Sequence, residues 1–202
     1  MGIEIERKFL VSGEGWKGLG KGVPFRQGYL QKGPCSVRIR TEGTRGVLTI
    51  KGPTRGISRM EYEYEIPLVD ADAMLDTLAG QPLIHKTRYA VPYAGKTWVV
   101  DVFDGENAGL VVAEIELESE TETFDLPPWV GKEVTHDRRY SNARLAEHPF
   151  ASWESLFGVI AFWKAGRPLS DDFGKFPDDL GIIFRAVRFH APGAVLHAAG
   201  EP

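Results

Sequence analysis

The feature that most constrains the fold is a period-two alternation of charged and apolar residues that recurs through the first 140 positions. Side chains alternate between two faces along a β-strand, so this period predicts strands rather than helices. The strands expected on this basis are Ile3–Val11, Ser36–Thr41, Val47–Lys51, Arg59–Pro67, His85–Pro92, Thr97–Phe103, Val111–Glu118 and Glu133–Arg139. Many short strands with few helices favour an α+β, β-dominated domain built on an antiparallel sheet or barrel.

Two short segments of the same region change to a helical pattern. Asp70–Leu78 has apolar residues at helical spacing and aspartates at its start, and a second helix is expected over Ser141–Glu147 with its first residue as the cap. Further on the composition changes, and the aromatic-rich segment Ala151–Trp163 favours another helix. We therefore divide the chain into a domain of residues 1–148 and a C-terminal extension of residues 149–202, to which the sequence assigns no role.

The overall charge argues against a general nucleic-acid-binding protein. A formal net charge of −4 gives no basic field across the molecule. No stretch approaches the roughly 18 uninterrupted apolar residues of a membrane span, and the first residues lack the basic-then-apolar pattern of a secretory leader. Cys35 is the only cysteine, which excludes an intramolecular disulfide and suits a reducing compartment. We expect a cytoplasmic protein that acts neither on nucleic acid nor at a membrane.

The charges on the expected strands are sorted by sign from one strand to the next. For a single strand, a solvated face explains the alternation. Like charges side by side repel, however, and a surface built for solubility intersperses the two signs. Clustered carboxylates attract a hard divalent cation, whereas clustered Arg and Lys bind phosphate oxygens, so a polyphosphate with its metal ion suits both sets. The acidic pairs are Glu4/Glu6, Glu61/Glu63 and Glu114/Glu116, and the basic pairs are Arg38/Arg40 and Lys86/Arg88.

An ordered series of short motifs resembles that of the CYTH superfamily, also called triphosphate tunnel metalloenzymes. The opening Glu4-Ile5-Glu6-Arg7-Lys8 matches the ExExK signature, which is too short to be specific alone. Its companions follow in the family order over residues 3–147: Arg26-Gln27-Gly28-Tyr29-Leu30, Val37-Arg38-Ile39-Arg40, Thr49-Ile50-Lys51, Arg59-Met60-Glu61-Tyr62-Glu63, Lys86-Thr87-Arg88-Tyr89, Val100-Asp101-Val102-Phe103, Ala113-Glu114-Ile115-Glu116 and Val134-Thr135-His136-Asp137-Arg138-Arg139-Tyr140-Ser141-Asn142.

The resemblance implies a closed eight-stranded antiparallel β-barrel that encloses a charged tunnel, with helices packed outside. The apolar faces of the strands would then point outward, under helices or against a second subunit in a homodimer. Family members hydrolyse inorganic triphosphate or thiamine triphosphate, and a separate branch cyclises ATP to cyclic AMP.

Matching positions imply roles for individual residues. The ligands of Mg²⁺ or Mn²⁺ would be Glu4, Glu6, Asp101, Glu114 and Glu116. The triphosphate would be bound by Lys8, Arg38, Arg40, Lys51, Lys86, Arg88 and Arg138, the last at a position where similar sequences often carry Lys. Arg59, Glu61, Glu63 and Tyr29 would line the tunnel and serve the reaction.

The first hypothesis is an inorganic triphosphatase, because the chain resembles the compact bacterial type. Water would attack directly, since no arrangement of Ser, Cys or His suggests a covalent intermediate. Thiamine triphosphatase and adenylate cyclase are the alternatives among enzymes. The alternative from another class is a module that binds a polyphosphate or nucleotide without turnover. The acidic pairs argue against that module, because anion binding alone gains nothing from added negative charge.

Overall fold

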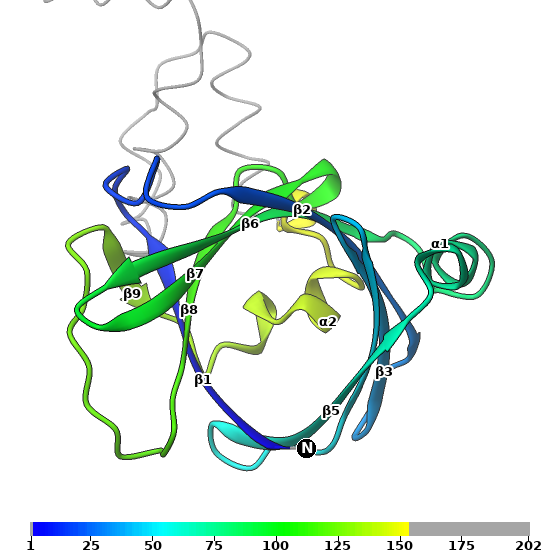
Figure 1. Ribbon diagram of the computed structural model, residues 1–202, viewed down its shortest axis with the longest axis horizontal. Coiled ribbons are helices and arrows are strands. Elements are labelled where there is room, and N and C mark those ends of the chain that lie inside the picture. The colour runs from blue at the N-terminus through cyan, green and yellow to red at the C-terminus, as the bar shows by residue number, and fades with distance from the viewer. Residues whose placement is uncertain (1, 154–202) are drawn as a thin grey trace, which may run out of the picture.

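The structure is a computed structural model that describes residues 2–153. Its strands form one antiparallel sheet that closes on itself around a central axis (Figure 1). The strands are β1 (Gly2–Val11), β2 (Gly22–Gln31), β3 (Ser36–Glu42), β4 (Arg45–Lys51), β5 (Ser58–Ile66), β6 (Ile84–Tyr93), β7 (Lys96–Asp104), β8 (Val111–Glu116) and β9 (Val130–Glu133). The α-helices are α1 (Leu68–Thr77) and α2 (Asn142–Leu145), and the short 3₁₀ helices are η1 (Gly105–Asn107), η2 (Arg138–Tyr140) and η3 (Phe150–Ser152).

The barrel is closed by the first strand. The sheet order is β5-β4-β3-β2-β6-β7-β8-β1-β9, and an additional pairing of β5 with β1 joins the two sides. Residues 2–5 of β1 pair with β5, whereas residues 6–10 pair with β8. Strand β9 is added beside β1 near Phe9 and Val11. The expected closed eight-stranded antiparallel barrel is therefore confirmed, with one extra strand.

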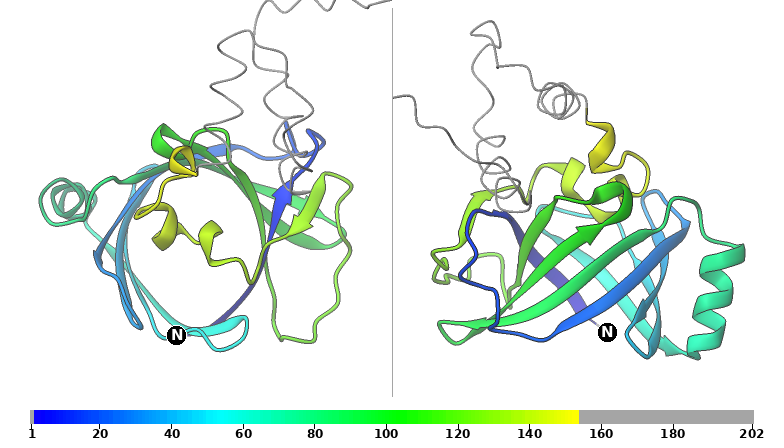
Figure 2. Two further views of the ribbon diagram at one scale, coloured as in Figure 1. Left: turned by 180° about the vertical axis from the view of Figure 1, so that it is seen from behind. Right: turned by 90° about the horizontal axis from the view of Figure 1, so that it is seen from above.

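The outer face of the barrel carries much of the apolar core. Helix α1 lies against β3 and β4, where Ala71 and Leu75 are buried with Ile39 (Figures 1 and 2). The segment that follows the helix approaches so closely that a Cβ on Gly28 would lie 2.7 Å from the Cβ of Ala79, so this position requires glycine. A second outer cluster centres on Trp98, which is fully buried. The expectation that apolar faces point outward is thus met at both clusters.

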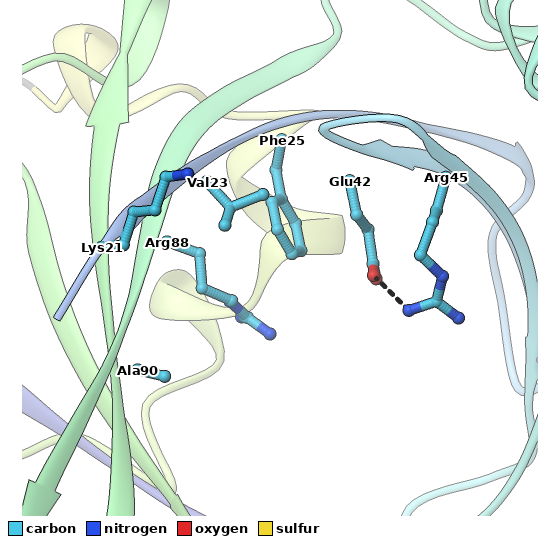
Figure 3. A pocket seen from close by; sticks show the side chains of 7 residues that line it. All are labelled: Lys21, Val23, Phe25, Glu42, Arg45, Arg88 and Ala90. Carbon is cyan, nitrogen blue, oxygen red and sulfur yellow. Dashed lines mark hydrogen bonds and ion pairs between the residues drawn. The ribbon is translucent and has the colours of Figure 1, made fainter.

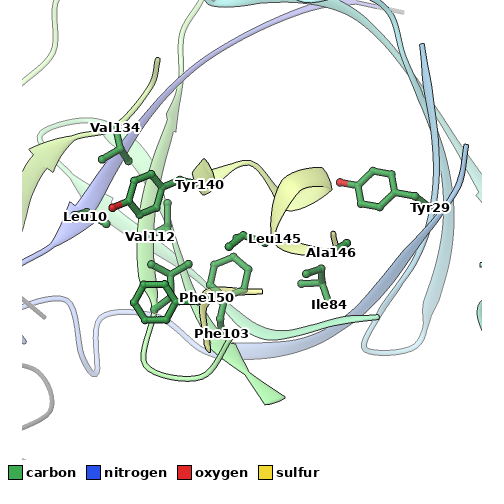
Figure 4. Close-up of a cluster of buried hydrophobic side chains, with 11 residues drawn as sticks. Leu10, Tyr29, Ile84, Phe103, Val112, Val134, Tyr140, Leu145, Ala146 and Phe150 are labelled. Atoms are coloured by element: carbon green, nitrogen blue, oxygen red, sulfur yellow. The ribbon is translucent and has the colours of Figure 1, made fainter. Parts of the chain in front are cut away.

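One end of the barrel is closed by helix α2, which crosses the opening instead of packing on the outer wall (Figure 4). The Oγ of Ser141 accepts a hydrogen bond from the backbone N–H of Arg144 at 3.3 Å, and this caps the helix as predicted. Leu145 is buried in a cluster that includes Tyr29 from the inner face of β2. Phe150 joins the same cluster, so the packed structure continues past residue 148.

The expected strands are confirmed except at two places. Strand β2 was absent from the expected set. The strand predicted over Glu133–Arg139 was wrong, because β9 ends at Glu133 and the chain then turns toward the closed end, where Val134 and Tyr140 are buried. The expected helix Asp70–Leu78 is confirmed as α1, whereas most of the expected helix Ala151–Trp163 lies outside the described residues. Within residues 2–153, none of the helices has the length and apolar character needed to cross a membrane.

Candidate active site: a charged tunnel

The strands direct their charged residues to the inside of the barrel. Residues paired across an antiparallel sheet share a face, and the pairs Lys8–Glu114 and Arg88–Asp101 continue around the barrel to Lys51–Glu61. The predicted site residues on this inner face are Glu4, Glu6, Lys8, Tyr29, Arg38, Arg40, Lys51, Arg59, Glu61, Glu63, Lys86, Arg88, Asp101, Glu114 and Glu116. Arg138 lies exposed in η2, away from these strands, so its role in substrate binding stays a prediction.

The most buried charges form a cluster on β6 and β7. The Nζ of Lys86 lies 2.6 Å from Asp101 Oδ2, and the guanidinium of Arg88 donates to both oxygens of the same carboxylate, at 2.7 and 2.6 Å. Burial alone would raise the pKa of Asp101, but Lys86 and Arg88 outweigh it and lower that pKa. Burial lowers the pKa of Lys86 to about 8, with Asp101 opposing this effect. The carboxylate of Asp101 is therefore fully engaged with cations of the protein.

A second cluster surrounds Glu4. Its carboxylate accepts from Lys51 at 2.7 Å and from the Nε of Arg59 at 2.5 Å, and Arg59 also reaches Glu6 at 3.2 Å. Burial would raise the pKa of Glu4, yet the two cations lower it from 4.5 to about 2. The same ammonium of Lys51 lies 3.0 Å from Glu61. Glu4 is ionised throughout the neutral range, and its two cations are free to exchange partners when another anion enters.

The cation of the opening motif bridges two strands. The Nζ of Lys8 contacts the carboxylate of Glu114 on β8 and lies 3.0 Å from Glu6 on its own strand. Burial would lower the pKa of Lys8, but these two acids outweigh it and raise that pKa. Lys8 is therefore a permanent positive charge in the middle of the inner face.

Strands β3 and β4 form a basic wall, which consists of Arg38 and Arg40 on β3 and Lys51 on β4. Its cations make ion pairs with the neighbouring carboxylates of Glu42, Glu61 and Glu63. Arg38 and Arg40 lie 3.4 and 3.0 Å from the carboxylate of Glu63, which both guanidinium groups share. Burial and then the neighbouring Arg38 lower the pKa of Arg40, and the same two effects lower the pKa of Lys51. Arg38 thus disfavours the charged forms of Arg40 and Lys51, and an added anion would stabilise both of them. This wall is suited to phosphate oxygens.

The carboxylates of β1 and β8 form an acidic cluster, in contrast to the basic wall of β3 and β4. Glu116 is paired across the sheet with Glu6 and makes no ion pair within the described part of the chain. Burial and then Glu4 and Glu6 raise the pKa of Glu116, because like charges face one another. Residues 2–153 hold no ready-made group of three acidic, histidine or cysteine side chains for a metal. The oxygen-only donors Glu4, Glu6 and Glu116 nevertheless fit a hard divalent cation, which would relieve their repulsion.

The end of the barrel opposite α2 contains a cavity of about 350 Å³ (Figure 3). Its basic residues Lys21 and Arg45 lie at strand ends, and Arg88 links it to the buried cluster. Lys21, Phe25 and Arg45 were not among the predicted site residues. Phe25 was missed because the inner face of β2 carries no run of like charges, and Lys21 and Arg45 because they lie at strand ends outside the matched motifs. The cavity is lined by Lys21, Val23, Phe25, Glu42, Arg45, Arg88 and Ala90.

A family model described as the CYTH domain matches residues 2–148. The chain belongs to the CYTH family. A CYTH relative from Acetivibrio thermocellus, named inorganic triphosphatase, is 51% identical over 155 residues, which are 76% of this chain and 99% of the relative. Another from Nitrosomonas europaea with the same name is 40% identical over 148 residues, or 71% of this chain and 96% of the relative.

A solved structure agrees with this assignment. The crystal structure of an inorganic triphosphatase is 37% identical to this CYTH chain, with a TM-score of 0.54, and the match covers 72% of this chain and 95% of that one. The family predicted from the short motifs is therefore confirmed. The matches cover nearly the whole length of each relative.

Proposed function

We propose that this protein hydrolyses inorganic triphosphate to pyrophosphate and phosphate inside the barrel, with Mg²⁺ or Mn²⁺ as cofactor. The observation that carries the proposal is that one tunnel contains both a cluster of basic residues and a carboxylate, Glu116, that faces other carboxylates. The Arg38 and Arg40 wall favours an anion, whereas Glu116 beside Glu6 favours a cation. A metal-bound triphosphate supplies both charges at once. The names of the two curated relatives support the same substrate.

The inner cations would bind and orient the substrate. Arg38, Arg40 and Lys51 would hold phosphate oxygens, and Lys8 would neutralise charge at the centre of the tunnel. Charge spreads over phosphate oxygens in the transition state, so positioned cations lower the barrier without covalent chemistry. Water attacks the terminal phosphorus, the bridging P–O bond breaks, and pyrophosphate leaves while the proton of the water passes to solvent.

The divalent cation would be held by the carboxylates of β1 and β8. Glu4, Glu6 and Glu116 are the ligands that the inner face offers on one wall, with Glu114 next to them on β8. Bound there, such a cation polarises phosphate oxygens and lowers the pKa of its water. Asp101 is less suited to this role than Glu116, because its carboxylate is 1% exposed and accepts from Lys86 and Arg88, whereas Glu116 makes no ion pair within the described residues. Its assignment as a metal ligand stays a prediction.

The cavity opposite α2 bears on the choice among substrates. Its apolar residues Phe25, Val23 and Ala90 lie beside Arg88, so an organic group attached to the last phosphate is the alternative occupant. Thiamine triphosphate and ATP therefore remain as second candidates. We place the activity in the cytoplasm, since the exposed free thiol of Cys35 suits a reducing compartment. Homodimer formation through the outer face also remains a proposal.

The test measures phosphate release from inorganic triphosphate, thiamine triphosphate and ATP, each with Mg²⁺, Mn²⁺ or EDTA. We expect metal-dependent release that is greatest with inorganic triphosphate and is lost in Glu4→Gln and Arg38→Ala. The matched control is Arg26→Ala, since Arg26 lies on the outer face against α1. Preference for an organic triphosphate would move the assignment to that substrate. Tight binding of triphosphate without any turnover would favour the binding module.

A further inference from the structure

Gln27 is a polar residue of β2 that is completely buried and whose side-chain amide makes no hydrogen bond within the described residues. Its side chain is 0% exposed, and neither the amide oxygen nor the amide nitrogen has a hydrogen-bond partner within residues 2–153. Exchanging the positions of the two amide atoms does not resolve this, because both lack a partner. A buried amide without partners destabilises a fold, so its presence in a close-packed strand needs another explanation.

The position of Gln27 is on the inner face of the tunnel. It lies between Phe25 and Tyr29, whose side chains point into the barrel (Figures 3 and 4), and it is paired across the sheet with Arg40 and Ile84. Residues i and i+2 of a strand share a face, so the amide projects to the same side as these neighbours. Gln27 is therefore adjacent to Arg40 of the basic wall.

Two cations lie on the strands that flank Gln27, close to its neighbour Phe25. The ring of Phe25 lies 5.7 Å from the guanidinium carbon of Arg40 and 5.9 Å from the Nζ of Lys86. These cations bracket the strand on both sides, since Arg40 is on β3 and Lys86 is on β6. An amide in this setting donates its N–H to a phosphate oxygen, while its oxygen accepts from a cation that holds the same phosphate.

We propose that Gln27 is a substrate-binding residue whose amide nitrogen donates a hydrogen bond to a phosphate oxygen of the triphosphate in the tunnel. The proposal rests on the proposed function, because it assigns a further contact for that substrate. The contact is neutral, which distinguishes it from those of the surrounding arginines. It adds affinity and orientation without adding charge, so its contribution does not depend on screening by salt.

The test replaces the amide by a side chain of similar length and volume. Gln27→Met removes both polar atoms but fills the same space, and Gln31→Met makes the same change at an exposed position of β2. Gln27→Glu keeps the shape and replaces the N–H donor by a second acceptor. The readouts are the melting temperature, the Kd for tripolyphosphate in EDTA by calorimetry, and kcat/KM with Mn²⁺.

We expect Gln27→Met to melt a few degrees higher, because an unpaired polar group has been removed from the interior. Its binding of tripolyphosphate should be about tenfold to a hundredfold weaker, by the same factor at low and high salt. Gln27→Glu should bind more weakly still, and Gln31→Met should change neither quantity. Unchanged binding in Gln27→Met overturns the proposal. A lower melting temperature or failure to fold also overturns it, since the amide would then be structural.

Failure of the proposed function gives a different result. Wild-type protein that binds tripolyphosphate but releases no phosphate would contradict the hydrolase assignment and leave the Gln27 contact testable by its Kd. Conversely, a wild-type enzyme that turns over and a Gln27→Met variant with unchanged Kd and kcat/KM would retain the hydrolase and remove the contact.

Discussion

Two carboxylates on neighbouring strands of one tunnel have opposite surroundings, since one is paired with cations of the protein and the other faces carboxylates. Asp101 on β7 is 1% exposed and receives hydrogen bonds from Lys86 and Arg88 on both of its oxygens. Glu116 on β8 is exposed and faces other acids, and its pKa is raised by burial and by Glu4 and Glu6. The carboxylate of Asp101 is neutralised by cations of the protein itself. That of Glu116 makes no ion pair within the described residues, and we propose that it binds a cation from outside. Both residues lie on the inner face of a strand with alternating charged and apolar residues. Their surroundings differ because β7 is paired with β6, which carries cations, whereas β8 is paired with β1, which carries Glu6.

The largest effect is expected from Asp101→Asn, which removes the carboxylate that forms the buried ion pair with Lys86. Taking one partner from a buried ion pair leaves an uncompensated charge, which costs about 3–5 kcal/mol. Urea unfolding at neutral pH measures this loss, with Glu116→Gln as the matched control for removal of a carboxylate. A loss below about 1 kcal/mol would show that the cluster is hydrated and that the contrast with Glu116 is unfounded.

The next effect concerns pH and Glu4, whose pKa falls from 4.5 to about 2 on folding. A depressed pKa stabilises the folded state above the unfolded value, and that stability is lost as the pH falls from 4.5 toward 2. The wild type should therefore exceed Glu4→Gln by up to about 3 kcal/mol at neutral pH. The difference should shrink below pH 4.5 in acid-dependent unfolding curves. A constant difference across this range would contradict the ion pairs of Glu4 with Lys51 and Arg59.

A third prediction separates stability from metal binding at Glu116. Glu116→Gln should change the free energy of unfolding by no more than about 0.5 kcal/mol, since the side chain has no ion-pair partner to lose. The Mn²⁺ concentration for half-maximal phosphate release should rise at least about tenfold, because a carboxylate ligand has been replaced by an amide. Titration of activity and of Mn²⁺ binding by electron paramagnetic resonance gives both numbers. A large loss of stability with unchanged metal dependence would reverse the comparison with Asp101.

The smallest effect is expected outside the tunnel, at Arg26. Its guanidinium lies 3.1 Å from Asp72 on α1 and also contacts Asp76, and these carboxylates are largely exposed. Exposed ion pairs contribute little, so Arg26→Gln should lower the free energy of unfolding by about 1 kcal/mol or less and leave kcat/KM unchanged. High salt should remove most of the remaining difference. A larger loss would show that the helix is held to the barrel by charge more than by the packing of Leu75.

The sequence predicts most of the barrel because sorted charges mark the inner faces of its strands. Strand β2 lacks this mark, since its inner face carries Phe25, Gln27 and Tyr29 and its outer face includes Gly28 under α1. The uncharged inner face of β2 and the glycine on its outer face are both explained only by contacts with residues that are distant in sequence. The end of β9 depends likewise on the closed end of the barrel, where Val134 is buried in the cluster that includes Leu145.

The inner-face position of the charged strand residues was predictable from the alternation, but their ion-pair partners were not. The alternation places Asp101 and Glu116 on inner faces alike, and only the sheet order puts Lys86 and Arg88 around one of them. Gln27 could not be selected from its residue type, because a lone amide in a strand is ordinary. Its significance comes from complete burial without a hydrogen-bond partner in the described structure. The helix over Ser141–Glu147 was predictable from its cap, whereas its location across the barrel end was not.

The way β1 divides its pairing has a consequence for how the chain folds. Strands β2 to β8 lie beside partners along a continuous path, while β1 must join β5 at one half and β8 at the other. Contacts between segments far apart in sequence form late, because closing a long loop costs entropy before any contact repays it. Until β1 docks, the open sheet has two bare edges that invite aggregation. Glu4 lies on one half of this strand and Lys8 on the other, so the inner face is complete only after closure, and a triphosphate bound there would favour the closed state by mass action.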